Sequence, residues 1–342
     1  MKIAYVVDTK VSALGIAATS RARSNPEVSV IEGLNFVTPG HLSNHLSRGN
    51  YDLVIFSWRF LAYELLSFRH LRGAIRKLSR DSSLALVIPD HLGSDGDLAK
   101  KEAALIKSID YFLVTSEVLF RHYSEKYPNK CKGILHDMPD LESLQVARHR
   151  SKPTSEKMIW VGNSQWGERM GFKDHKRFNE IVKVLLSRNQ NIHIIDASVR
   201  RLSNVEVLNE VRESTYLIQC SKSEGTGMPV LEAAAVGTIP ITTVVGVSKE
   251  LLIGDLIPLL VDPDVVSFEK TFKWAMANKS WLPSKLIERF DEYIQGALLE
   301  EIFYPSEAGE HIIEQSFSKE IRSYCKWMLR SLIYKFKSLK TN

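Results

Sequence analysis

Two glutamates, Glu224 and Glu232, stand eight positions apart around a glycine-containing turn. Glycine lets backbone N–H groups approach a pyrophosphate, and Pro229 fits the start of a helix, where its missing N–H would have no partner anyway. A helix that begins there offers free N–H donors and a partial positive charge to phosphates. The carboxylates can accept hydrogen bonds from sugar hydroxyls. The segment therefore predicts a site for a nucleotide-activated sugar. The residues between the two acids are Gly225, Thr226, Gly227, Met228, Pro229, Val230 and Leu231.

The segment continues as an alanine-rich run and then a turn from Gly237 into a strand at Ile239. It resembles the retaining glycosyltransferases of family 4, of the bacterial cell-surface polysaccharide type, whose pattern reads roughly E-G-x-G-[LM]-P-x-x-E-A-x-A-x-G-x-P. Val236 and Ile239 depart mildly from it. The resemblance implies the GT-B fold, with Glu224 on the donor sugar and Glu232 on the ribose. An ordinary strand–loop–helix with solvent-facing glutamates is the alternative.

The loop after Gly162 supplies candidate cations for a pyrophosphate that gains charge as it departs. The resemblance implies that Gly162 lies against the donor and that the basic roles fall to Arg169 and Lys173. Lys176 is a rival for the same role, and Asn163 stands where the family often has an arginine. Solvated charges on a loop are the alternative for each basic residue.

In the first half of the chain, His91 follows an apolar run, and ligands of open α/β sheets bind beyond the carboxyl ends of strands. The resemblance implies that His91 faces the donor sugar across a cleft, while a histidine that caps a loop is the alternative. Gly15 is the nearest equivalent of the family's glycine-rich loop after the first strand, although one glycine stands where two are common.

Apolar, β-branched runs alternate with helical stretches in both halves, which predicts buried parallel strands and α/β domains. We expect two Rossmann-like domains that face a central cleft, covering residues 1–150 and 158–314, with residues 144–157 as the linker. Expected strands are Ile3–Val7, Val28–Ile31, Leu53–Ser57, Leu84–Ile88, Tyr111–Thr115, Met158–Val161, Ile192–Ile195, Tyr216–Cys220, Ile239–Thr243 and Ile257–Leu260. Expected helices include Tyr63–Leu78, Leu98–Ile109, Asp174–Arg188 and Met228–Val236.

The C-terminal segment is strongly basic. Residues 316–342 carry seven basic residues and one acid, a net charge of +6, which leaves about −1 for the rest against the overall +5. Apolar residues recur there at spacings of three and four, which predicts a cationic amphipathic helix. We expect residues 315–342 to pack on the first domain, or residues 319–340 to contact an anionic membrane surface, or both. The expected apolar stripe is Ile321, Cys325, Met328, Leu332, Phe336 and Leu339.

Bulk properties limit the class of protein. The three cysteines are well separated and form no zinc or CxxC pattern. No signal peptide and no apolar run of membrane-spanning length is evident, so we expect a cytoplasmic protein. If the basic helix binds lipid, we expect the protein to be peripheral on the inner face of the cytoplasmic membrane. Nucleic acid is not expected as a partner, because the basic residues lie in one terminal helix without a recognition motif.

Two other enzyme classes stay open. Gly225-x-Gly227 before a helix is typical of dinucleotide-dependent oxidoreductases, but Val230 stands at the third glycine position. Asp95 and Asp97 form the DxD pattern of metal-dependent glycosyltransferases, although a solvated turn is the simpler interpretation.

The leading prediction is a retaining glycosyltransferase that moves a sugar from a nucleotide-sugar donor to a glycan or lipid-linked acceptor. The donor would lie on the second domain, and no cofactor or metal is expected. By the resemblance, the departing phosphate takes the acceptor's proton, so that catalysis is positioning and electrostatic stabilisation.

Overall fold

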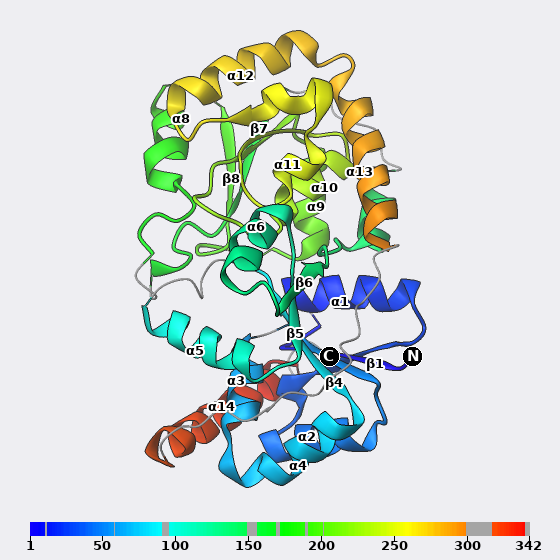
Figure 1. The fold of residues 1–342 in the computed structure, drawn as a ribbon. Helices are drawn as coiled ribbons and strands as arrows, with labels where there is room; N and C mark the ends of the chain where they lie inside the picture. Colours follow the sequence, from blue (N-terminus) through cyan, green and yellow to red (C-terminus); the bar gives the residue numbers. More distant parts are fainter. Residues whose placement is uncertain are drawn as a thin grey trace. The chain divides into compact units, whose positions relative to one another are not determined.

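The structure is a computed structural model, and it describes residues 1–10, 12–57, 59–90, 96–148, 156–168, 172–188, 191–200, 202–298 and 317–338 (Figure 1). These residues form two compact units, each built on one sheet of parallel strands. Among the described residues, no helix is both long and apolar enough to cross a bilayer.

The first unit holds Met1–Thr115, Leu119–Met138 and the C-terminal helix α14 (Phe317–Ser338). Its six strands lie in the order β2-β1-β3-β4-β5-β6, and all neighbours are parallel. The strands are β1 (Ile3–Val7), β2 (Val28–Glu32), β3 (Leu53–Phe56), β4 (Ser83–Ile88), β5 (Tyr111–Val114) and β6 (Cys131–Ile134). The helices are α1 (Ala13–Ser24), the 3₁₀ turns η1 (Gly33–Asn35) and η2 (Arg69–Leu71), α2 (Pro39–Arg48), α3 (Arg59–Ser67), α4 (Arg72–Asp81), α5 (Gly96–Lys107) and α6 (Glu117–Lys126).

The central strands β1, β3 and β5 are apolar at every position, and β4 is apolar after Ser83, because both faces of the sheet are buried. Ile3, Tyr5 and Val7 of β1 pack into one core cluster, while Ala4 and Val6 pack into the cluster on the opposite face. A strand covered on both sides reads as a continuous apolar run rather than an alternating one.

The second unit holds Pro139 to the end of α13, together with Ser116–Val118. Its sheet has the order β11-β10-β9-β7-β8, again all parallel. The strands are β7 (Met158–Gly162), β8 (Ile192–Asp196), β9 (Tyr216–Gln219), β10 (Ile239–Thr243) and β11 (Leu260–Val261). The helices are α7 (Leu141–Arg148), the π-helical turn η5 (Phe178–Val182), α8 (Lys183–Ser187), α9 (Asn204–Arg212), α10 (Met228–Ala235), α11 (Ser248–Leu251), the 3₁₀ segment η6 (Gly254–Leu259), α12 (Val265–Asn278) and α13 (Leu282–Leu298).

The division between the units falls after Met138, earlier than the sequence analysis placed it. The residues of α7 were expected in the first domain and the linker, but the helix packs against α9 and α10 of the second unit. Its last residue, Arg148, donates to the carbonyl of Ala235 at 2.7 Å and pairs with Asp291 at 2.8 Å. The rest of the expected linker, residues 149–155, lies outside the described residues.

Two expected elements differ clearly from the structure, and one strand of the structure was not expected. The helix expected at Tyr63–Leu78 is two helices, α3 and α4, separated at the buried Phe68. The strand expected at Ile257–Leu260 is mostly the 3₁₀ segment η6, which contains Pro258, and only β11 pairs with β10. The short edge strand β6 was not expected, because Lys132 and Gly133 interrupt its apolar character.

Helix α14 packs on the first unit, but through a different face from the one expected. It contacts η1 and α3 (Figure 1). Trp327 is buried in the core, and its indole N–H donates to the carbonyl of Phe36 at 3.0 Å. Ser331 donates to the carbonyl of Leu34 at 2.8 Å. By contrast Cys325 and Leu332, which belong to the expected packing stripe, are exposed.

Candidate functional site

The candidate site forms where the chain direction reverses within the second sheet. From β7 the chain runs outward to β8 and returns to β9 on the other side of β7. Parallel strands of open α/β sheets bind ligands outside their carboxyl ends at such a switch point. Gly162 ends β7 and Gln219 ends β9, so the loops that follow them meet there.

Glu224 is held by two donors, one from the loop after β7 and one from the last residue of β9. Lys176 forms an ion pair with Oε1 of Glu224. The side-chain amide of Gln219 donates to the same oxygen at 2.7 Å and also reaches Ser221 Oγ at 3.0 Å. The Lys176 and Glu224 side chains are each 15% exposed, so the pair is accessible but largely removed from solvent. The carboxylate is thus fixed in orientation, with its other oxygen available to a hydroxyl donor.

A tight turn brings Lys176 to this position. Asp174 and Arg177 both have positive φ, at 42° and 47°. The Asp174 carboxylate accepts backbone N–H groups of Asn179 at 3.1 Å and Glu180 at 3.0 Å, which fixes the start of the helical segment. The turn is tied to the following loop by the Lys222 N–H, which donates to the His175 carbonyl at 2.8 Å.

Aromatic packing supports the same turn. His175 is buried, and its ring Nε2 lies 2.9 Å from the Ser223 carbonyl. Burial lowers the pKa of His175, and the bond to Ser223 opposes this only in part, so the ring is neutral at pH 7 and donates there. The Trp166 ring lies against His175 with centroids 4.5 Å apart, and the Lys176 amino group lies 5.2 Å from the Trp166 centroid.

Helix α10 begins at this site, and no side chain of the described residues caps its N-terminus. Gly227 is the N-cap, in the left-handed conformation with φ of 79°, and Pro229 is the second helical residue. The turn therefore needs glycine at this position, because a side chain at that φ is strained. The uncapped N–H groups and the helix dipole form an anion-binding end.

The loop after β10 supports the turn from behind. The Val247 N–H donates to the Thr226 carbonyl at 2.9 Å. Gly246 has φ of 53°, and a Cβ built there would lie 2.2 Å from that carbonyl oxygen. Only glycine permits this close approach, so Gly246 belongs to the architecture of the site, although the sequence analysis did not identify it.

Glu232 lies on α10 and is 6% exposed. Burial raises the pKa of Glu232 to about 8, and the neighbouring charge of Asp140 adds to the shift. Within the described part of the chain, no side chain is recorded in a hydrogen bond or ion pair with its carboxyl group. A buried carboxyl that lacks a protein partner and has a perturbed pKa is a ligand-binding candidate.

The structure brings together some of the predicted residues and leaves others apart. Lys176, the rival candidate, contacts Glu224, whereas Lys173 is exposed and its carbonyl accepts from the Lys222 amino group at 3.1 Å. Gly162 ends β7 against the Trp160 ring. Gly225 and Thr226 are buried in the turn, Met228 starts α10, and Val230 is buried in it.

In the first unit, Gly15 lies in the first turn of α1, and its N–H donates to Ser12 at 3.0 Å. A Cβ at Gly15 would lie 1.9 Å from the Thr9 carbonyl oxygen. The glycine therefore allows the loop after β1 to pack closely against the start of α1. His91, Arg169 and Asp95 lie outside the described residues. Asp97 lies in α5. Asp90, next to His91, is held by Arg59 at 2.6 Å.

The described residues contain no cluster of three or more His, Cys, Asp or Glu side chains suited to a metal ion. The three cysteines are free, with Cys131 and Cys220 buried.

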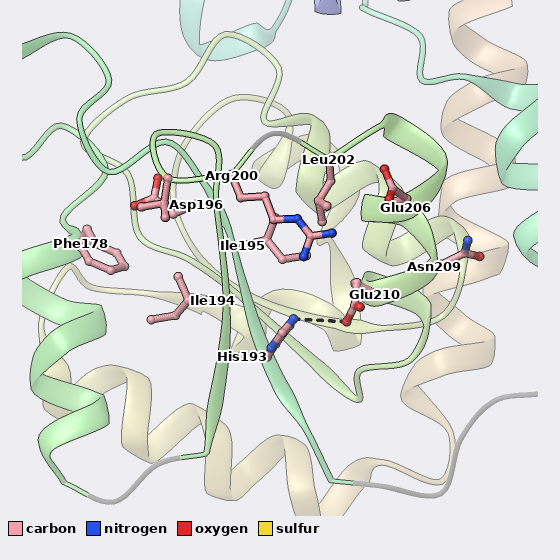
Figure 2. Close-up of a pocket in the computed structure, with 11 residues that line it drawn as sticks. Phe178, His193, Ile194, Ile195, Asp196, Arg200, Leu202, Glu206, Asn209 and Glu210 are labelled. Carbon is pink, nitrogen blue, oxygen red and sulfur yellow. Dashed lines mark ion pairs between the residues drawn. The ribbon is translucent and has the colours of Figure 1, made fainter.

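A second feature of this unit is a cavity of about 540 Å³ beside β8, one of the two edge strands of the sheet (Figure 2). His193 and Glu210 point toward one another there, with His193 Nε2 3.3 Å from the Glu210 carboxylate. Phe178 lies at one side of the cavity and α9 at the other. None of the predicted site residues lines it, so it is separate from the Glu224 site.

Part of the chain matches a known protein family. Residues 178–296 match the family model of glycosyl transferases group 1, a segment that includes Glu224, α10 and Glu232. No curated protein matches the sequence.

Solved structures share the fold at low sequence identity. Sucrose-phosphate synthase from Thermosynechococcus elongatus superposes with a TM-score of 0.60 at 14% identity, covering 87% of this chain and 97% of that one. A glycosyltransferase from Rickettsia africae gives 0.53 at 13% identity, covering 100% and 99%. HepE from Anabaena, solved in complex with UDP-glucose, gives 0.56 at 11% identity, covering 86% and 95%. The predicted GT-B fold, with two Rossmann-like α/β domains, is confirmed.

Proposed function

We propose that this chain, a glycosyltransferase by its group 1 domain and GT-B fold, transfers a sugar from a nucleotide-diphosphate donor bound at the start of α10. In this proposal the diphosphate lies at the uncapped helix end, Glu224 accepts hydrogen bonds from the sugar, and Glu232 accepts them from the ribose. The complex of HepE with UDP-glucose supports a nucleotide-sugar as the donor class.

One observation carries the proposal: Gly227 holds the left-handed N-cap of α10 between two carboxyl groups of different character. Glu224 is ion-paired and partly accessible, while Glu232 is buried with a raised pKa. The three features follow one another along the segment and match the three parts of a donor. The charged Glu224 suits the sugar, the helix end suits the diphosphate, and the buried Glu232 suits the ribose.

The proposed chemistry retains the configuration at the anomeric carbon. The departing phosphate takes the acceptor's proton, and the protein positions both substrates. Lys176 supports this mechanism, since an ammonium group beside Glu224 can stabilise the charge that develops on the leaving diphosphate. The acceptor is proposed to be a glycan or a lipid-linked sugar of a cell-surface polysaccharide.

Donor hydrolysis across a panel of nucleotide-sugars tests the proposal. We expect one or a few donors to be hydrolysed slowly without acceptor, with loss of activity in Glu224→Gln and weaker nucleotide binding by calorimetry in Glu232→Gln. NMR of the released sugar and of transfer products reports the anomeric configuration. The donor-site assignment fails if both variants bind and hydrolyse donor as the native protein does.

A further inference from the structure

Helix α14 has one face buried against the first unit. The residues of that face, Trp327, Ser331 and Tyr334, follow at spacings of four and three and therefore share one side of the helix. Trp327 is 1% exposed, and Tyr334 donates its hydroxyl to Glu32 at 2.7 Å. This face fixes the helix on the protein, so the opposite side must look outward.

The outward side is apolar. Leu329 is 58% exposed, Leu332 42% and Ile333 45%, and Cys325 is also exposed. We call Cys325, Leu329, Leu332 and Ile333 the outer strip. Large exposed aliphatic residues elsewhere in the described chain are scattered, whereas three of them fall here within five positions of one helix. Single exposed aliphatic residues need no explanation, but a contiguous patch marks an interaction surface.

The charge of the same helix indicates what covers the strip. Helix α14 carries six basic residues and one acid, and the chain outside residues 316–342 has a net charge of about −1. Lys326 is exposed beside the strip, and Arg330 pairs with Glu64. A second copy of the chain would bring two cationic helices together, and nucleic acid offers no apolar partner for the strip. An anionic lipid surface satisfies both features.

We propose that α14 docks the protein on an anionic membrane surface, with the outer strip among the acyl chains and Lys326 at the headgroups. Trp327, Ser331 and Tyr334 keep the helix fixed to the first unit while its other side enters the interface. The partner is a bilayer rich in anionic lipid. The proposal does not depend on the donor site, which lies in the other unit.

Vesicle co-sedimentation of the full-length protein tests it. We compare the native protein with Leu329→Ser/Leu332→Ser/Ile333→Ser on phosphatidylcholine vesicles with and without phosphatidylglycerol. The matched control is Ile253→Ser/Ile257→Ser/Val266→Ser, which removes three similarly exposed aliphatic residues from the second unit. We expect the native protein and the control to bind anionic vesicles in a salt-dependent manner, and the strip variant to bind about tenfold or more weakly.

The exposed Cys325 provides a second measurement that leaves the strip's aliphatic residues in place. An environment-sensitive fluorophore on this thiol should shift to the blue with anionic vesicles and be quenched by brominated acyl chains. The proposal is overturned if the fluorophore shows no blue shift and the native protein does not bind anionic vesicles. It is also overturned if the strip variant binds these vesicles as tightly as the native protein. A strip variant that changes a dimer to a monomer in light scattering, with vesicle binding unchanged, assigns the strip to self-association instead. Hydrolysis of a soluble donor should be unchanged in the strip variant, so the two proposals can fail separately.

Discussion

The amino group of Lys176 is paired with the carboxylate of Glu224, which lies 48 residues further along the chain. The pair joins the loop that leaves β7 to the loop that leaves β9, at the reversal point of the second sheet. It therefore joins the two segments that the proposed donor must touch, and it distinguishes Lys176 from the exposed Lys173.

Replacing Lys176 with Met should reduce donor turnover by roughly 100-fold, because the leaving diphosphate of the proposed donor loses a cation and Glu224 loses its ion-pair partner. Lys173→Met is the matched control, since Lys173 is exposed on the same turn. Steady-state kinetics with the best donor compares the two. Equal losses of turnover in the two variants would mean that the positive charge of the turn matters, and not the ion pair of Lys176 with Glu224.

Glu232 should make stability depend on pH. Its pKa is raised from 4.5 to about 8 in the folded protein, so the unfolded chain releases this proton first as pH rises. Stability is then lost progressively between about pH 4.5 and 8 and is constant above that range, by an amount on the order of a few kcal/mol.

The Glu232→Gln variant removes this titration, so denaturant unfolding at several pH values should show a smaller loss between pH 5 and 8 than in the native protein. Glu213→Gln, at an exposed position in the same unit, is the control and should follow the native curve. If the native and Glu232→Gln curves are parallel, the carboxyl group titrates normally in the folded protein.

Gly246→Ala should destabilise the second unit and weaken nucleotide binding. Its Cβ would lie 2.2 Å from the Thr226 oxygen, so the turn before α10 must move. Gly254→Ala is the matched control, because Gly254 also has positive φ, 58°, but its Cβ would meet nothing within 4 Å. The control should lose about 1–2 kcal/mol from backbone strain alone. Thermal unfolding measures the loss of stability in both variants, and calorimetry with nucleotide measures whether the turn before α10 has moved. Equal effects of Gly246→Ala and Gly254→Ala on nucleotide binding would contradict this account.

Trp327→Ala should destabilise the first unit by about 3–5 kcal/mol, because it empties a buried core position and removes the donor to Phe36. Leu329→Ala, two residues further on the exposed side, should change stability by less than about 0.5 kcal/mol. Chemical denaturation of both variants measures the difference. A similar loss in the two would mean that both sides of α14 are packed.

Much of the fold could be predicted because buried parallel strands are continuous apolar runs. Ile3–Val7 and Ile239–Thr243 have the expected bounds. Strand β6 could not be recognised, since an edge strand with Lys132 needs no apolar run. The inner face of α14 was also misassigned. Periodicity favoured the aliphatic residues, whereas Trp327 and the polar contacts of Ser331 and Tyr334 determine which side packs.

Part of the candidate site could likewise be predicted from the sequence, and part could not. Glu224, Gly227 and Glu232 lie in one contiguous segment, so their spacing could be interpreted from the sequence. The choice between Lys173 and Lys176 could not, because it depends on a turn whose residues Asp174 and Arg177 adopt positive φ. Gly246 was missed for a related reason, since its contact with Thr226 joins segments that are separate in the sequence.

The burial of Trp327 in the core of the first unit has a consequence for biosynthesis. A ribosome adds roughly 5–20 residues per second, and domains near the N-terminus usually fold first. Here the core of the N-terminal unit lacks Trp327 until α14 emerges, which happens only after the entire second unit has been translated. The later unit can thus reach its native state first, and a prematurely truncated chain would carry an N-terminal half with an unfilled core.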